Sequence, residues 1–132
     1  MIRRRMTKKK GEPYIDKVYI KASGDYTIPA NCTKIDLFLV GGGGAGGKWV
    51  SWGYCPGASG SGGGTASIKG ITVTPGQIIS ITIGKGGSSY SSNGGSTTVN
   101  VNASSYTAPG GNGGLISRNG VYDTDPYNCW YK

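Results

Sequence analysis

The sequence contains no histidine, and only six of its 132 residues are acidic. Histidine is the side chain that most often transfers protons near neutral pH. Most of the carboxylates are placed like surface or turn residues; they are Glu12, Asp16, Asp25, Asp36, Asp123 and Asp125. The sequence therefore offers no arrangement for catalysis, and we expect a protein that is not an enzyme and uses no cofactor.

The three cysteines, Cys32, Cys55 and Cys129, include no C-x-x-C pair. Without that pair and without histidine, a structural zinc site is not expected. An odd number of cysteines also leaves one thiol over in any complete disulfide framework. We expect reduced, partly buried thiols, with a Cys55–Cys129 bridge as the open alternative.

Long apolar runs are missing as well. No stretch approaches the roughly 20 apolar residues that cross a bilayer, and the basic start of the chain is not followed by the apolar segment of a secretory signal. We expect no membrane insertion and synthesis in a cytoplasm.

Glycine is present in excess: 26 residues, where average usage gives about 9 in a chain of this length. Much of it lies in three tracts, 41–64, 84–95 and 110–114. Ordering glycine costs more backbone entropy than ordering any other residue. The tracts are therefore either linkers or tightly packed loops, and their positions between apolar segments favour packed loops.

The apolar segments alternate as β-strands do. Residues 34–40 place Ile35, Leu37 and Leu39 on one face, and residues 77–84 and 96–101 alternate in the same way. Short strands separated by turns at 8–12 residues indicate an all-β domain. We predict a small antiparallel β-sandwich or barrel with long glycine-rich loops.

One hairpin is predicted from about Thr65 to Gly84. Before Thr74, the alternation in Ala66–Ile68 is out of phase by one residue with that in Ile71–Val73. A bulge at Gly70 would restore the register. Thr74–Gln77 then has the signature of a type II turn, with Pro75 second and Gly76 supplying a positive φ.

The glycine tracts lack the residues of a nucleotide site. A phosphate-binding loop needs a lysine followed by serine or threonine at the start of a helix. Here Lys48 precedes Trp49 and Lys85 precedes Gly86. Asp123–Asn128 has oxygen ligands suited to calcium, but a capped turn explains these residues more simply.

Basic residues are concentrated at the start of the chain: Arg3, Arg4, Arg5, Lys8, Lys9 and Lys10. The rest carries eight basic and six acidic residues, so we divide the chain into an arm, 1–12, and a glycine-rich β-domain, 13–132. The arm is interpreted as a solvated tail or as an anchor on an acidic surface of a larger assembly. Nucleic-acid binding is the less favoured interpretation, because no aromatic stacking platform is adjacent.

Aromatic residues interrupt the first glycine tract and end the chain. Trp49, Trp52 and Tyr54 form the first group, and Tyr127, Trp130 and Tyr131 the second. Three interpretations stay open: the rings cover the domain's own sheet, form a subunit interface, or stack on glycans of a host surface.

Several motifs occur in an order that resembles a known family. Asp25–Gly44 contains a Thr-Ile-Pro turn and an alternating strand that ends in polyglycine; Val73–Gln77, Ile83–Gly87 and Gly94–Thr98 follow it. This order resembles the glycine-rich domain of phage tail-fibre and other virion proteins. The basic start is similar to short structural proteins of phages of gut Bacteroidetes, including the crAss-like group.

The resemblance implies a virion or adhesion role without catalysis. The first hypothesis is a phage virion structural protein that decorates the capsid or tail or forms part of a fibre. It would be assembled in the host cytoplasm, contact other virion proteins through the arm and form a homo-oligomer. The second hypothesis is a host-surface glycan-binding adhesin domain, and the third a nucleic-acid-binding accessory protein.

Overall fold

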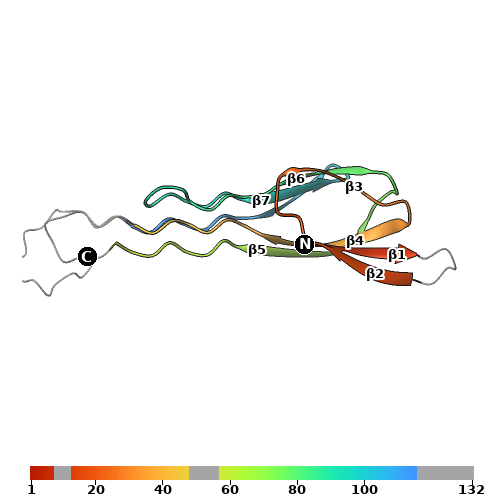
Figure 1. Cartoon of the computed structure of the whole chain (residues 1–132), viewed down its shortest axis with the longest axis horizontal. Coiled ribbons are helices and arrows are strands. Elements are labelled where there is room, and N and C mark those ends of the chain that lie inside the picture. The colour runs from red at the N-terminus through yellow and green to blue at the C-terminus, as the bar shows by residue number, and fades with distance from the viewer. Residues whose placement is uncertain (8–12, 48–56, 116–132) are drawn as a thin grey trace, which may run out of the picture.

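The computed structural model describes residues 1–7, 13–47 and 57–115 of the chain, and these residues form an all-β sandwich (Figure 1). The first sheet has the strand order β2-β1-β4-β5 and the second sheet β3-β6-β7-β8, all neighbours antiparallel. The strands are β1 Ile2–Thr7, β2 Pro13–Val18, β3 Gly24–Thr27, β4 Cys32–Val40, β5 Thr65–Thr72, β6 Ile78–Thr82, β7 Thr97–Val101 and β8 Ser104–Ala108. The predicted sandwich is therefore confirmed, and the two sheets do not close into a barrel.

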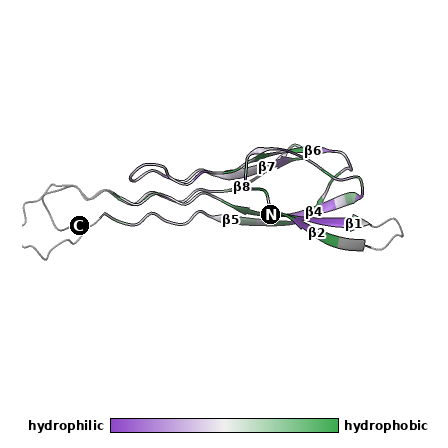
Figure 2. Ribbon diagram, viewed as in Figure 1, coloured by the Kyte–Doolittle hydropathy of each residue, from purple (hydrophilic) through white to green (hydrophobic). Residues whose placement is uncertain are grey.

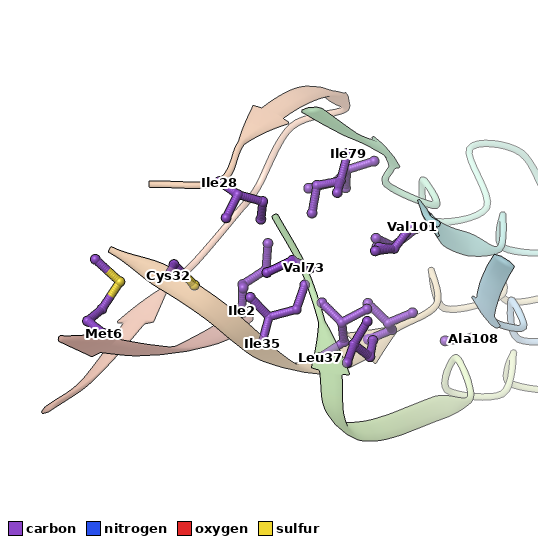
Figure 3. Close-up of a cluster of buried hydrophobic side chains, with 14 residues drawn as sticks. Ile2, Met6, Ile28, Cys32, Ile35, Leu37, Val73, Ile79, Val101 and Ala108 are labelled. Carbon is purple, nitrogen blue, oxygen red and sulfur yellow. The ribbon is translucent and has the colours of Figure 1, made fainter. Parts of the chain in front are cut away.

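The core lies between the two sheets, where the alternating residues meet (Figure 3). On β4, Ile35 and Leu37 are at most 1% exposed, and Ile79 on β6 and Val99 on β7 face them from the second sheet. The period-two pattern of these strands is confirmed. The core continues through Cys32, whose side chain is completely buried and whose thiol is free.

Gly70 forms the predicted bulge in β5. Its φ of +72° lies in the region that favours glycine. The register pairs Leu37 with Ile68 but Ile35 with Ile71, so β5 has one residue more than β4 between these pairs. The extra residue allows Ile68 and Ile71 to face the same side of the sheet despite their odd spacing.

The prediction of a hairpin from Thr65 to Gly84, in contrast, is wrong. The turn exists, with Gly76 at a φ of +79° and the Gln77 N–H donating to the Thr74 carbonyl at 3.0 Å. However, β5 pairs in the first sheet and β6 in the second. The turn therefore carries the chain from one sheet to the other instead of joining two paired strands.

The predicted boundary between an arm, 1–12, and the β-domain also needs correction. β1 lies inside the first sheet, with Arg4 opposite Asp16 of β2 and opposite Ile35 of β4. Ile2 and Met6 are buried in the core. Residues 2–7 thus belong to the β-domain.

A two-residue turn at Asn102 and Ala103 joins β7 to β8. Both residues have positive φ, 51° and 60°, which is the arrangement of a type I′ hairpin turn. The Asn102 side chain donates to the Thr72 carbonyl at 2.7 Å and accepts from the Gln77 amide at 2.8 Å. These bonds connect the turn to the first sheet and to the turn before β6.

The glycine tracts form a bundle of extended segments beyond one end of the sandwich (Figure 1). We call residues 41–47, 57–64, 84–95 and 109–115 the glycine bundle. The N–H groups of Gly41, Gly44 and Gly47 donate to the carbonyls of Gly64, Ser61 and Ala58, respectively. A hydrogen bond to the same neighbour at every third residue is the repeat of a polyproline II-type helix.

Segment 41–47 is the centre of the bundle. Besides segment 57–64, it contacts residues 84–95 through the Ala45 N–H, which donates to Ser92 O at 2.9 Å. It contacts segment 109–115 through its Gly42 carbonyl, which accepts from the Gly111 N–H at 2.8 Å. Neighbouring segments thus provide hydrogen-bond partners for backbone groups that lie outside the two β-sheets.

Glycine is required where these segments approach each other. A Cβ atom built on Gly44 would clash with the Asn112 carbonyl, and one on Gly60 with the Gly44 carbonyl. Gly57, Gly60 and Gly63, three residues apart, all face the central segment in this way. The tracts are therefore packed, as predicted, but as a hydrogen-bonded bundle and not as loops.

Candidate interaction surfaces

The outer face of the first sheet collects basic residues from three strands. Alternation on β1 directs Ile2 and Met6 into the core and Arg3 and Arg5 to the other face. Arg3 is opposite Lys17 of β2 and Asp36 of β4, and Arg5 is opposite Ile15 and Lys34. Residues directly opposite each other share one face. We define the basic face as Arg3, Arg5, Ile15, Lys17, Lys34, Asp36, Phe38 and Val40.

Asp36 lies at the centre of the basic face and is only 7% exposed. Its carboxylate is 4.0 Å from an Arg3 guanidinium nitrogen and 3.7 Å from one of Arg5. It also accepts a hydrogen bond from the Gly70 N–H at 2.7 Å. The sequence suggested a surface position for this residue, but the bulge and the two arginines enclose it.

The half of the basic face nearest the glycine bundle is apolar. Phe38 and Val40 are 42% and 51% exposed. The backbone of Phe38 pairs with Met1: the Phe38 N–H donates to the Met1 carbonyl at 2.9 Å, and the Met1 ammonium donates to the Phe38 carbonyl at 2.8 Å. Partial burial lowers the pKa of that ammonium. Figure 2 shows β1 coloured as hydrophilic.

Arg4 points the other way, into the edge of the sandwich. Its guanidinium donates to the Tyr26 hydroxyl of the second sheet at 2.8 Å and to the Asp16 carboxylate of β2. Of the six basic residues predicted as an anchor, Arg3 and Arg5 thus share a surface, whereas Arg4 joins the two sheets. Lys8, Lys9 and Lys10 lie outside the described residues.

The basic face could be predicted only in part. Lys17, Lys34 and Phe38 were not among the predicted contacts, because nothing showed that β1 lies between β2 and β4. One signal was present: Ile2 and Met6 are spaced evenly around the arginines, as on the inner face of a strand.

A second surface lies toward the far end of the glycine bundle. A shallow, open hollow is lined by residues 45–47 of the central segment and by residues 87–90. Tyr90, on the turn of the short 84–95 segment, is 67% exposed beside it. The aromatic residues predicted as interface or glycan contacts, Trp49, Trp52, Tyr54, Tyr127, Trp130 and Tyr131, lie outside the described residues.

The remaining chemistry of the described residues is limited. Burial raises the pKa of the Cys32 thiol, which donates to the Lys34 carbonyl at 3.4 Å and is not a reactive group. Cys55 and Cys129 lie outside the described part of the chain. Within that part, no three histidine, cysteine or acidic side chains gather in a way that would hold a metal. No helix long and apolar enough to cross a bilayer is found there either.

Comparison with known families places most of the chain in one of them. A family model described as a glycine-rich domain matches residues 21–127, from the loop between β2 and β3 through the whole glycine bundle. No curated protein and no solved structure matches the chain.

Proposed function

The chain belongs to the glycine-rich domain family, and from this premise we propose that it is a non-enzymatic structural protein of a phage virion. It decorates the capsid or tail or forms part of a fibre, and it is incorporated during assembly in the host cytoplasm. The main support is the glycine bundle, a projection built almost entirely from hydrogen-bonded backbone.

The shape of the molecule fits a part that projects from a surface. Seven residues of a polyproline II-type helix span about 20 Å. The four segments of the bundle lie side by side, and segment 84–95 folds back on itself, so the chain makes five passes. Mutual hydrogen bonds hold each pass straight, which a flexible glycine linker would not achieve. The sandwich at the other end offers the basic face as the attachment side.

The proposal is tested on purified particles. An antibody against the purified protein should label intact virions from the source culture in electron micrographs, and the protein should co-sediment with them. Light scattering of the free protein reports whether it forms the expected homo-oligomer. A stable monomer that is absent from particles would overturn the proposal.

A glycan-binding adhesin is the second candidate. Its support is the hollow that Tyr90 lines together with small residues, because an exposed aromatic ring at an open hollow offers a stacking face for a sugar. Glycan-array binding that is lost in Tyr90→Ala and kept in Ser59→Ala, on another segment, would favour it. If Trp49→Ala and Trp52→Ala bound glycans as well as the unaltered protein, the predicted tryptophan contacts would be excluded.

A further inference from the structure

The basic face carries an uneven distribution of charge and apolar surface. Arg3, Arg5, Lys17 and Lys34 supply four positive charges, and Asp36 returns one negative charge, so the face has a net charge of +3. The arginine side chains remain 40% and 52% exposed although both are near Asp36. The Nε of Arg3 is buried, but the exposed N–H donors of the two guanidinium groups are available to a second carboxylate.

The exposed apolar residues lie among and beside these charges. Ile15 is 52% exposed opposite Arg5, and Phe38 and Val40 continue the face toward the bundle. A sheet surface with exposed apolar side chains next to cations is typical of a protein interface, where arginine and aromatic residues are enriched.

We propose that the basic face is a docking surface for another protein, whose contact region has acidic residues opposite Arg3, Arg5, Lys17 and Lys34 and apolar residues opposite Phe38 and Val40. The identification of that partner as a virion protein rests on the proposed function; the docking surface itself does not. Charge complementarity fixes the orientation, with the partner's acidic part farthest from the glycine bundle.

Two other occupants fit the face less well. A second copy of this chain would bring four cations against four cations, which is repulsive. A single-stranded nucleic acid needs several stacking surfaces, but among the residues that define the basic face Phe38 is the one aromatic residue. Ile15 and Val40 offer no flat ring, and Asp36 repels phosphate at the centre.

The test uses a pair of charge-reversal variants of the full chain. Lys17→Glu with Lys34→Glu alters the basic face without removing an ion pair that the structure shows. Lys21→Glu with Lys85→Glu changes the net charge equally but lies off this face, and both lysines are exposed. Circular dichroism and thermal melting first establish that both variants fold.

Binding is measured by fluorescence anisotropy with three labelled probes: a polyglutamate peptide, an alternating glutamate–leucine peptide, and an oligothymidine of the same charge. We expect the glutamate–leucine peptide to bind best. The Lys17/Lys34 variant should lose about tenfold or more in affinity, whereas the Lys21/Lys85 variant should stay within about twofold. Phe38→Ser should remove the preference for the peptide with leucine.

Each contrary result has a distinct meaning. Tightest binding by the oligothymidine would assign the face to nucleic acid, and equal losses in both charge variants would show unspecific attraction. Absence of binding by all three probes would also overturn the proposal. Particle incorporation separates the two proposals: a Lys17/Lys34 variant that is incorporated normally contradicts the docking surface alone, whereas absence of the unaltered protein from particles contradicts the proposed function.

Discussion

The sandwich and the glycine bundle bury different parts of the chain. Leu37 and Ile79 fill the space between the sheets with side chains at a period of two. In the bundle, Gly44 and Gly114 have no side chain, and neighbouring carbonyls occupy the space at a period of three. Apolar burial stabilises the sandwich, whereas the bundle depends on backbone hydrogen bonds that must offset the entropy of ordering glycine. Stability and projection are thus provided by separate regions.

The largest expected loss comes from the sandwich. Leu37→Ala removes a side chain that is 1% exposed and leaves a cavity between the sheets. We expect the free energy of unfolding to fall by about 3 kcal/mol in urea denaturation. Val40→Ala on the same strand, where the side chain is 51% exposed, should cost less than about 1 kcal/mol. Similar losses in the two variants would contradict the inner and outer faces of β4.

A methyl group tests the bundle. Gly44→Ala places a Cβ against the Asn112 carbonyl, so segments 41–47 and 109–115 must separate. We expect a loss of roughly 2 kcal/mol and faster amide hydrogen exchange in the bundle than in the sandwich. Gly62→Ala is the matched control, because nothing lies within 4 Å of its Cβ position. If both variants exchanged at the same rate, the bundle would not be packed as described.

The junction between the two regions depends on Thr97. Its hydroxyl donates to the Val40 carbonyl at 2.7 Å and accepts from the Gly84 N–H at 2.9 Å, and the residue is 3% exposed. Thr97→Val leaves both backbone groups without this partner, and we expect a loss of about 1–2 kcal/mol in thermal or urea unfolding. Thr82→Val, exposed on β6, should be nearly neutral. Equal stability of the two variants would contradict a role for the hydroxyl.

The smallest effect is a gain. Ala103 has a φ of 60°, where a Cβ is unfavourable. Ala103→Gly should therefore stabilise the chain by about 0.5–1 kcal/mol, seen as a higher Tm. Ala66→Gly, in the regular part of β5, should lower the Tm by a comparable amount. A lower Tm for Ala103→Gly would contradict the type I′ turn.

The sequence predicted the strands whose apolar residues alternate. β4, β6 and β7 follow from that pattern, and Gly70 and Gly76 mark a bulge and a turn that the structure confirms. The hairpin failed because a turn reverses the chain locally but does not select the strand's partner. β5 pairs with β4 and β6 with β3 and β7, contacts between residues far apart in the sequence.

Three other features could not be predicted from composition and periodicity: the place of β1 in the sheet, the burial of Asp36 and the structure of the bundle. β1 contains three consecutive arginines, so its inner residues Ile2 and Met6 were hidden in a charge cluster, and Asp36 gave no sign of its enclosure. The basic face depends on the position of β1 within the sheet and on the enclosure of Asp36. The bundle has no alternation of polar and apolar residues, and its sequence signal is the three-residue spacing of glycines, as in Gly57, Gly60 and Gly63.

That spacing also determines how the length of the projection can change. One turn of each segment is three residues and about 9 Å. Adding a single Gly-x-x triplet to every pass would extend the bundle by one turn and keep each glycine against its neighbour. An insertion of one residue would instead rotate the rest of a segment by a third of a turn and bring side chains such as Ser59 or Ser61 inward. The length of the glycine bundle can therefore change in steps of three residues, and with it the distance that the bundle extends from the sandwich.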